Sequence, residues 1–438
     1  MKRMLMDELV LWKSNPNRKP LVLNGARQVG KTWLLKEFGT RHFASVAYVS
    51  LDNDAVARSY FDMDLDARRI IASLSLQLNM DIVPEKTLII LDEIQACPKA
   101  ITALKYFCEN APEYAVAAAG SLLGLSAHEG SGFPVGKVNM LDLHPLTFSE
   151  FLEATGNGRY AGLIESGDVN LMTPFAPTLE GLLRQYYVVG GMPGAVNAYL
   201  AGDDFRAARR VQEELLAGYE RDFSKHVPPR LLGRMMLTWA SIPRHLSREN
   251  KRFVFGQVRK GGRAADFEEC LAWLEEAGLI RKVQRVDKPG LPLSAYAEQA
   301  IFKVFLLDIG LLGAMCELNP EAILAGSAVF TEFKGALTEQ YVCQELIASC
   351  GFTPFYWSAE NSTGEIDFLV QDGGKIYPIE VKAEENLRAK SLRAFASKYD
   401  GVHARRFSMS GYRDQDWMRN VPLYAIGHYG LWRADGPR

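Results

Sequence analysis

The chain has 438 residues, of which 48% are hydrophobic and 23% are charged, and its formal net charge is −2. This length predicts about two or three domains, each with a core of its own. The near-neutral charge excludes a bulk attraction to nucleic acid, so any basic surface has to be local. No apolar run is long enough to span a bilayer and the N-terminal segment is too charged for a signal peptide, which predicts a soluble cytoplasmic protein without membrane contact.

The strongest motif lies near the N-terminus, in the stretch KPLVLNGARQVGKTWLLKEFG. An apolar strand at 21–23 leads into a loop of the form G-x-x-x-x-G-K-[ST], and a helical pattern follows. Such loops wrap backbone N–H groups around phosphate oxygens at a helix N-terminus. We expect Lys31 to reach the β- and γ-phosphates of ATP and Thr32 to hold Mg²⁺. The predicted nucleotide-binding residues are Gly25, Ala26, Arg27, Gln28, Val29, Gly30, Lys31 and Thr32.

Two later strands are predicted to end beside this loop. The stretch TLIILDEIQ ends an apolar strand at Asp92 and Glu93. In a parallel sheet this position supplies the carboxylate on the metal side, so we expect Asp92 to act on Mg²⁺ and Glu93 to polarise an attacking water. The stretch EYAVAAAGS ends a third strand at Ser121, which either senses the γ-phosphate or caps the following turn. The predicted catalytic residues are therefore Lys31, Glu93 and Ser121.

These motifs stand in a recognisable order with LDLHPLTFSEFL (141–152) and GGMP (190–193). The chain resembles, over nearly its whole length, a prokaryotic family of AAA-type P-loop ATPases with a C-terminal restriction-endonuclease-like domain. The resemblance implies a helical lid over the nucleotide and a homo-oligomer, with a ring as the AAA-type arrangement. It implies an Arg at the position of Lys137, and a Lys lacks the planar fork of Arg. An arginine finger is therefore not assigned, and Arg159, Arg184 and Arg221 stay open as alternatives.

The sequence pattern in the middle of the chain predicts helices followed by a winged helix. Residues 145–227 read as the helical lid, and 228–325 as three helices and a two-stranded wing. The third helix is acidic, which disfavours reading of the major groove and leaves a protein contact open. A basic face precedes it, and it is interpreted as a DNA phosphate contact, with a solvated face or a subunit contact as alternatives. This face consists of Arg244, Arg248, Lys251, Arg252, Arg259, Lys260 and Arg263.

The last part of the chain contains a predicted hairpin, EIDFLVQDGGKIYPIEVKA (365–383). Side chains alternate across a strand, so Asp367, Glu380 and Lys382 are expected together on its polar face. An amphipathic helix before the hairpin carries Glu339. The set resembles the PD-(D/E)xK endonuclease site, which implies Asp367 and Glu380 as metal ligands and Lys382 as the group that orients water. Such a domain can also keep its fold and contacts without cutting.

The predicted fold is α/β, with an AAA-type P-loop core at 1–144, a lid at 145–227, a winged helix at 228–325 and an α/β endonuclease-like domain at 326–438. The predicted function is Mg²⁺-dependent ATP hydrolysis coupled to DNA binding or remodelling. The alternative is an ATP-dependent signalling switch whose later domains bind protein partners. The six cysteines form no C-x-x-C pair, which predicts free thiols rather than zinc ligands or disulfides.

Overall fold

The computed structural model describes residues 1–121, 132–248, 251–325, 328–359, 364–383 and 389–433. Its chain divides into two compact units. One, the N-terminal unit, comprises Lys2–His144 and Trp273–Leu279. The other, the C-terminal unit, comprises Met1, Pro145–Ala272 and Ile280–Arg438. All six cysteines are free thiols. Within the described residues, no helix combines the length and the hydrophobicity needed to cross a membrane.

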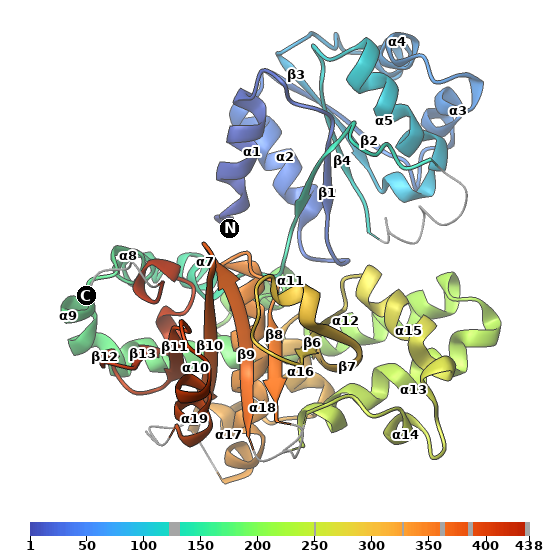
Figure 1. The fold of residues 1–438 in the computed structure, drawn as a ribbon. Coiled ribbons are helices and arrows are strands. Elements are labelled where there is room, and N and C mark those ends of the chain that lie inside the picture. Colours follow the sequence, from blue (N-terminus) through green and yellow to red (C-terminus); the bar gives the residue numbers. More distant parts are fainter. Residues whose placement is uncertain (122–131, 249–250, 326–327, 360–363, 384–388, 434–438) are drawn as a thin grey trace. The chain divides into compact units, whose positions relative to one another are not determined.

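The N-terminal unit is built on a parallel sheet of five strands in the order β2-β3-β4-β1-β5. Both faces of the sheet carry helices (Figure 1), which is the usual arrangement of parallel sheets. The strands are β1 (Leu21–Asn24), β2 (Ser45–Ser50), β3 (Thr87–Asp92), β4 (Ala115–Ala119) and β5 (Asn139–Asp142). The helices are α1 (Leu5–Ser14), α2 (Lys31–His42), α3 (Ala55–Met63), α4 (Ala67–Leu78) and α5 (Pro98–Asn110).

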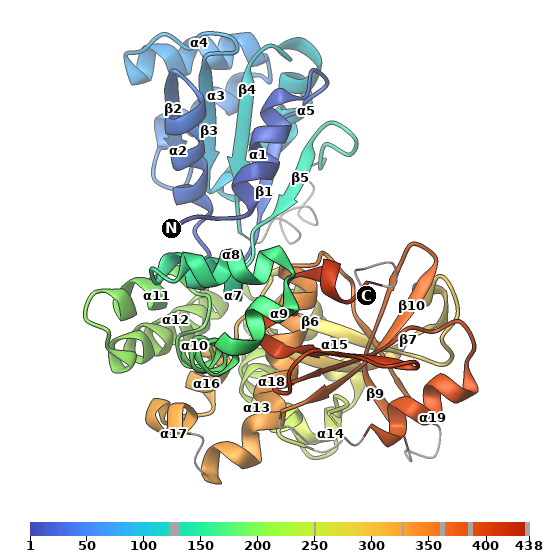
Figure 2. The ribbon, with the colours of Figure 1, turned by 90° about the vertical axis from the view of Figure 1, so that its left-hand side faces the viewer.

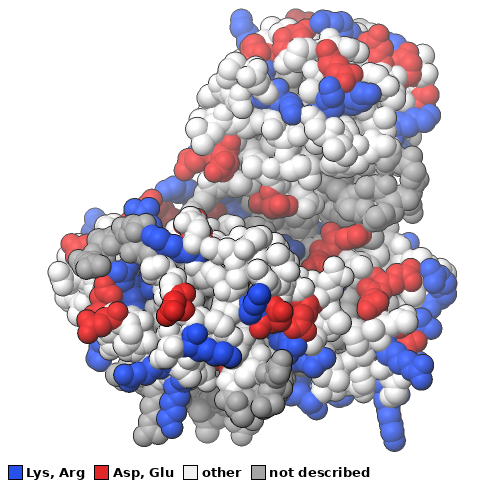
Figure 3. Space-filling model, in the orientation of Figure 1, with Lys and Arg blue, Asp and Glu red and all other residues white. Residues whose placement is uncertain are grey.

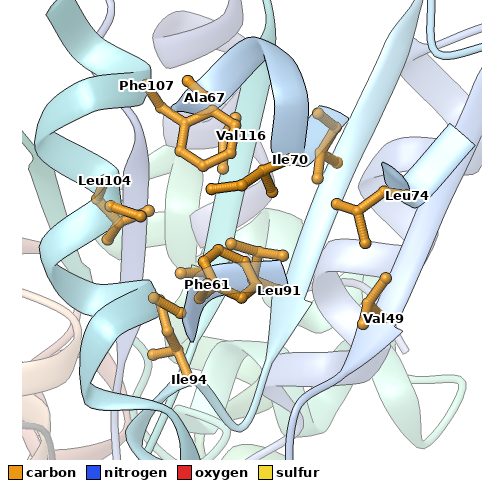
Figure 4. Close-up of a cluster of buried hydrophobic side chains, with 14 of the residues drawn as sticks. Val49, Phe61, Ala67, Ile70, Leu74, Leu91, Ile94, Leu104, Phe107 and Val116 are labelled. Atoms are coloured by element: carbon orange, nitrogen blue, oxygen red, sulfur yellow. The ribbon is translucent and has the colours of Figure 1, made fainter. Parts of the chain in front are cut away.

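The core of this unit lies between the sheet and the three helices α3, α4 and α5. Figure 4 shows Phe61 of α3, Ile70 of α4 and Leu104 of α5 pointing toward Leu91 of β3. Strands β3 and β4 are buried along their whole length, because helices cover both of their faces. This burial explains why both strands read as continuous apolar runs, and it fixes the strand ends that carry the predicted catalytic residues.

The C-terminal unit contains a mixed sheet of eight strands in the order β12-β13-β11-β10-β9-β8-β6-β7. Helix α18 packs on one face of this sheet and α19 on the other (Figure 2). The strands are β6 (Ile280–Val286), β7 (Ala297–Leu306), β8 (Phe355–Ser358), β9 (Glu365–Asp372), β10 (Lys375–Lys382), β11 (Ala404–Ser408), β12 (Arg413–Asp414) and β13 (Met418–Pro422).

The helices of the C-terminal unit lie before its sheet and between the strands of that sheet. Before the sheet run α7 (Phe148–Ala154), α8 (Gly158–Ser166), α9 (Val169–Met172), α10 (Ala176–Val189), α11 (Pro193–Leu200), α12 (Phe205–His226), α13 (Pro229–Leu246), α14 (Phe255–Val258) and α15 (Ala264–Glu276). Between its strands run α16 (Ile309–Met315), α17 (Pro320–Ala325), α18 (Ala328–Ala348) and α19 (Lys390–Lys398). The last residues of α15, from Trp273 on, are grouped with the N-terminal unit.

Helix α18 holds the C-terminal unit together through buried polar side chains. The amide of Gln340 pairs with the backbone of Leu306 in β7, accepting from N–H at 2.9 Å and donating to C=O at 2.7 Å. Gln344 accepts from the backbone N–H of Ile309 at 3.1 Å. Each of these buried groups has found a partner on another element, as burial of polar atoms requires.

One more buried residue of α18 reaches the first helix of the unit. The carboxylate of Glu345 accepts a hydrogen bond from the backbone N–H of Phe148 at 2.8 Å and one from the hydroxyl of Ser349. Phe148 begins α7, so the carboxylate caps the N-terminus of that helix from a distance of 197 positions along the chain. Segments 145–227 and 328–348 therefore fold as parts of one unit.

The GGMP motif has a structural explanation in the same unit. Gly190 has a φ of +68°, and a Cβ atom there would lie 2.3 Å from a carboxylate oxygen of Asp308. A Cβ atom on Gly191 would lie 2.1 Å from the carbonyl oxygen of Leu146. The N–H of Gly191 donates to Asp308 at 2.6 Å, and its C=O accepts from the N–H of Leu146 at 2.7 Å. Only glycine fits at either position.

The four-part division predicted from the sequence differs from this architecture. The wing hairpin of β6 and β7 is present, but β6 also pairs in parallel with β8, joining Arg285 to Tyr356. The expected boundary between 325 and 326 therefore lies within one continuous unit, because strands on both sides of it share a sheet. The expected lid at 145–227 packs into the same unit, and its place over the nucleotide stays a prediction, as does the winged-helix assignment of α13, α14, α15 and the hairpin.

The buried carboxyl of Glu345 predicts a pH dependence of stability. Burial raises its pKa from 4.5 to about 7, with a smaller contribution from Glu150. Because the folded-state pKa is the higher one, this group favours folding most below pH 4.5, and its contribution is lost as the pH rises toward 7. Glu345→Gln keeps an acceptor for Phe148 and a donor for Ser349 but cannot ionise. We expect it to raise the free energy of unfolding at pH 8 by on the order of 3 kcal/mol and to leave it nearly unchanged at pH 4.5.

Urea denaturation of the wild type and the variant at both pH values measures this difference. Glu214→Gln, at an exposed position on α12, is the matched control and should show no such pH dependence. Equal effects of Glu345→Gln at the two pH values would contradict the prediction.

Candidate functional site

The phosphate-loop motif forms the turn between β1 and α2, and its glycines are required there by the backbone. Gly25 has a φ of +148°, and a Cβ atom on it would lie 2.4 Å from the carbonyl oxygen of Leu143. Gly30 has a φ of +97° and directly precedes Lys31, the first residue of α2. The loop therefore opens onto a helix N-terminus, where backbone N–H groups and the helix dipole favour an anion.

Lys31 is buried at the base of this loop. Its ammonium donates to the carbonyl oxygens of Gly25 and Ala26, both at 2.8 Å. Burial lowers the pKa of Lys31 to about 8, although Glu93 and Asp92 favour the charged form. A phosphate anion in the loop would offset this cost of burial, so the loop and its lysine fit a nucleotide phosphate.

Asp92, the last residue of β3, is held by three hydrogen bonds. One carboxylate oxygen accepts from the hydroxyl of Thr32 at 2.8 Å and from that of Tyr48 at 2.9 Å. The other accepts from the backbone N–H of Glu93 at 3.1 Å. The Thr32 hydroxyl has thereby used its only hydrogen, which leaves its lone pairs for a cation. A hydroxyl and a carboxylate this close are a donor set that fits Mg²⁺.

Glu93 and Ser121 lie in a second group of polar contacts in the same unit. Glu93 has a left-handed backbone, with a φ of 50°, in the turn that leads into the short helix η1 (Ile94–Ala96). Its carboxylate accepts from the side-chain amide of Gln95. Ser121, which is 1% exposed, lies with its hydroxyl oxygen 3.5 Å from that amide nitrogen and 3.3 Å from Nε of Arg27. The alternative in which Ser121 caps a turn involves 122–131, outside the described residues.

The structure thus brings the predicted residues of the nucleotide site to the same ends of neighbouring strands. Lys31, Thr32, Asp92, Glu93 and Ser121 all lie there, while Tyr48 and Gln95 were missed by the sequence prediction. Tyr48 lies on β2, which runs parallel to β3 and ends beside it, with Ser50 paired to Asp92. A polar residue near the end of an adjacent parallel strand was therefore a signal for Tyr48. Gln95 stands in the LDEIQ motif itself.

The position that departs from the resembling family carries an ordinary ion pair. The ammonium of Lys137 lies 2.9 Å from Glu109 and both side chains are substantially exposed, so this pair contributes little. Arg159 and Arg221 are exposed and Arg184 is half-buried in the C-terminal unit. Nothing in their surroundings selects one of them as an arginine finger.

The predicted endonuclease-like residues lie in a buried ionic cluster of the C-terminal unit. Glu339 of α18 is 7% exposed. Its carboxylate lies 2.5 Å from the ammonium of Lys251 and 3.8 Å from that of Lys303, a fully buried residue of β7. Burial alone would raise the pKa of Glu339, but the two lysines hold it below its usual value. Lys303 also pairs with Glu365 at the start of β9.

The hairpin of β9 and β10 contributes the other predicted residues. The carboxyl of Asp367 accepts from the backbone N–H of Val381 at 2.7 Å, and burial together with Glu339 raises its pKa to about 7. Lys382 lies 2.7 Å from Glu380 and also experiences the charges of Asp367 and Glu339. Helix α18 packs against β10, so the polar face of the hairpin is partly covered: Glu380 is buried, whereas Asp367 and Lys382 are half-buried.

The metal site that the resemblance implies at this cluster stays a prediction. In the part of the chain that the structure describes, no group of three or more His, Cys, Asp or Glu side chains is positioned to hold a metal ion. In this cluster, the negative charge of Glu339 is matched by Lys251 and Lys303. Lys303 was missed, although a charged residue inside the apolar strand IFKVFLL is a signal of a buried ion pair.

The predicted basic face is corrected at one position. Six of its residues are exposed, namely Arg244, Arg248, Arg252, Arg259, Lys260 and Arg263. Lys251 is not, because its side chain is 12% exposed and paired with Glu339. In Figure 3, blue side chains project from the part of the molecule that holds α13, α14 and α15, and red ones lie among them. The exposed Glu269 of α15 pairs with Arg230 at 3.0 Å.

Comparisons with known proteins agree with the N-terminal site. Residues 17–152 match the family model described as an AAA domain. Residues 180–322 match a domain of unknown function (DUF8612), and 334–426 match another (DUF4143). No curated protein sequence matches the chain. The family match, the parallel sheet and the loop geometry together identify the N-terminal unit as a P-loop ATPase domain of the AAA class.

Similar solved structures include a Walker-type ATPase of Pyrococcus abyssi, with 14% identity, a TM-score of 0.45, and coverage of 71% of this chain and 94% of that one. The ORC1 protein of Aeropyrum pernix in complex with DNA has 14% identity and a TM-score of 0.28, over 73% of this chain and 92% of that one. Cdc6p of Pyrobaculum aerophilum has 14% identity and a TM-score of 0.27, over 74% and 96%.

The buried pair of Lys251 and Glu339 predicts a strong effect of removing one charge. Lys251→Met should lower the free energy of unfolding by about 3–5 kcal/mol, because it leaves Glu339 buried without its nearest counter-ion. Lys251→Met with Glu339→Gln should recover much of this loss. Hydrogen exchange of the α18 amides, together with urea denaturation, measures both effects.

Lys260→Met is the matched control, since Lys260 lies nearby in sequence but is exposed, and it should change stability by less than about 0.5 kcal/mol. A Lys251→Met protein as stable as the control would show that the pair of Lys251 and Glu339 does not contribute significantly to the free energy of unfolding.

Proposed function

We propose that this protein is a Mg²⁺-dependent ATPase that couples hydrolysis in its N-terminal unit to DNA binding by its C-terminal unit. One observation carries the proposal: the buried Lys31 ammonium lies on the phosphate loop, and Thr32 is hydrogen bonded to Asp92 at 2.8 Å. This is the arrangement in which a loop is ready for a phosphate and a hydroxyl–carboxylate pair is ready for a divalent cation.

The roles of the residues follow from their contacts. Lys31 binds the β- and γ-phosphates and compensates their charge. Thr32 and Asp92 hold Mg²⁺, which when bound neutralises charge on the phosphate oxygens. Tyr48 fixes the carboxylate of Asp92 from the next strand. Glu93 orients a water for attack on the γ-phosphate and accepts its proton, and Ser121 donates its hydroxyl hydrogen to a γ-phosphate oxygen.

DNA contact is proposed for the exposed basic residues around α13 and α14. Their charges extend from the chain into solvent, where they can replace the counter-ions of a phosphate backbone. The acidic helix α15 lies beside them, which favours backbone contact over reading of base edges. A protein partner on this face is the rival proposal, and it predicts no affinity for DNA.

For the endonuclease-like cluster we propose a role in folding without strand cleavage. The cluster keeps Asp367, Glu380 and Lys382 in the order of such sites. Lysine counter-ions at Glu339 support a structural role, since a metal-dependent nuclease needs carboxylates whose charge is left for the metal.

The nucleotide site is tested by two variants that should fail at different steps. Lys31→Ala removes the phosphate contacts, and we expect ATP affinity to fall by about 100-fold. Glu93→Gln keeps the contacts but cannot accept a proton, and we expect normal ATP binding with kcat lowered by roughly 10²- to 10⁴-fold. Calorimetry and phosphate release measure the two quantities. Lys86→Ala, at an exposed position before β3, is the control, and unchanged turnover of Glu93→Gln would refute the role of that residue.

The dependence of DNA affinity on salt concentration tests the DNA proposal. Binding of duplex DNA should weaken steeply with salt, and Arg244→Ala and Arg259→Ala should each reduce the slope of log K against log salt by about 1. Arg210→Ala, an exposed arginine of α12, is the control. DNA should also stimulate ATP hydrolysis, and supercoiled DNA should remain intact in the same mixtures with Mg²⁺. Absence of binding at low salt would exclude the DNA proposal and favour the protein partner.

A further inference from the structure

Gln95 lies at the centre of a set of contacts that the proposed function does not use. It stands in η1, two positions after Glu93. Its amide nitrogen donates to the carboxylate of Glu93 and lies 3.5 Å from the hydroxyl oxygen of Ser121. One side chain thus contacts the residue proposed to activate water and the residue proposed to sense the γ-phosphate.

The contacts continue from Ser121 into the phosphate loop. Nε of Arg27 lies 3.3 Å from the Ser121 hydroxyl oxygen and donates to it. Arg27 belongs to the loop itself, while Ser121 follows β4, the strand between β1 and β3 in the sheet. Four side chains therefore form a connected series from the loop to the water-activating carboxylate, in the order Arg27, Ser121, Gln95, Glu93.

The hydrogen-bonding capacity of Ser121 gives this series a direction. A serine hydroxyl can accept two hydrogen bonds and donate one. Arg27 and Gln95 occupy both acceptor positions, so the hydroxyl hydrogen has to point to a third group. A γ-phosphate oxygen is an acceptor of the kind that this hydrogen needs. Phosphate binding at Ser121 would then act on the position of Gln95, and through it on Glu93.

The local backbone explains why Glu93 needs such support. A left-handed conformation at a residue other than glycine is unfavourable, so the turn that carries Glu93 persists only where its surroundings hold it. In addition, Oε1 of Gln95 is buried and has no hydrogen-bond partner among the described residues. A buried acceptor without a partner is rare in folded proteins and marks a place where a donor such as water can bind.

We propose that Gln95 is a positioning residue for ATP hydrolysis, which holds the Glu93 carboxylate in place and links it through Ser121 to the phosphate loop. This inference rests on the proposed ATPase function and extends it by one residue. The proposed role requires the side-chain amide of Gln95 as a hydrogen-bond donor, because an ionised carboxylate can only accept hydrogen bonds. Removing that donor should disturb the orientation of Glu93 and leave the phosphate contacts of Lys31 intact.

The test compares Gln95→Ala with Gln95→Glu in the full-length protein. Both variants lose the donor, and Gln95→Glu keeps the shape while placing a like charge beside Glu93. We expect kcat to fall by about 10- to 100-fold in each, with Gln95→Glu at least as slow as Gln95→Ala. The dissociation constant for ATP should stay within about threefold of wild type, because the residues that bind phosphate are unchanged.

A double-mutant cycle with Ser121→Ala tests the connected series. Independent effects of the two substitutions on kcat would multiply. If Gln95 and Ser121 act together, the kcat of the double variant should exceed that product by about 5-fold or more. Gln77→Ala is the matched control, because the amide of Gln77 also donates to a carboxylate, that of Asp54 at 2.6 Å, but on the exposed surface of α4. It should keep the wild-type kcat.

The outcomes separate this inference from the proposed function. A wild-type protein that binds but does not hydrolyse ATP would refute the function. An active wild type with an inactive Glu93→Gln and a Gln95→Ala within twofold of wild-type kcat would refute the role of Gln95 alone. A Gln95→Glu variant with wild-type kcat beside a slow, destabilised Gln95→Ala would show that the residue only fills space.

Discussion

The C-terminal unit depends on the requirement that a buried charge has a partner. Helix α18 carries its polar residues inward, and each is met by a group from a distant part of the chain: Gln340 by β7, Glu345 by the start of α7, and Glu339 by Lys251 and Lys303. Breaking such contacts costs several times more than forming them contributes, because the remaining group stays desolvated. The helix therefore specifies which elements belong to the unit, and it joins segments that a linear division would place in separate domains.

The same requirement changes the functional interpretation of two predicted sites. Lys251 is part of a basic stretch, and a stretch of this kind usually lies in solvent. Here it turns inward to Glu339, so the face proposed to contact DNA has one cation fewer, and one acid of the cluster is paired. Each prediction was consistent with its own segment. They conflicted only where the two segments meet, at one ion pair between residues 88 positions apart.

Local patterns were sufficient for the nucleotide site and insufficient for the rest of the architecture. The glycines, Lys31 and Thr32 follow one another in the chain, and parallel strands bring Asp92 and Glu93 to the same edge, so the proximity of these residues could be predicted from spacing alone. The hairpin of β9 and β10 was predicted correctly for the same reason. Pairing of β6 with β8 and the inward orientation of Lys251 are long-range contacts, and no local periodicity contains them. The ATPase class of the first unit is confirmed by the match of residues 17–152, whereas the lid, the ring and the endonuclease-like fold stay predictions.

The two acidic sites differ in the charge of the groups that hold them. Asp92 is held by the hydroxyls of Thr32 and Tyr48 and by a backbone N–H, which are neutral donors. They fix its orientation while its negative charge is left for a cation. Glu339 is held by two ammonium groups, which fix its orientation and also cancel its charge. A divalent cation entering at Glu339 would have to displace a lysine and leave that lysine buried near a second positive charge. The ammonium of Lys31 also experiences the charge of Asp92, but it is hydrogen bonded to the carbonyl oxygens of Gly25 and Ala26 and not to Asp92, so a cation at Asp92 would not have to displace a buried lysine.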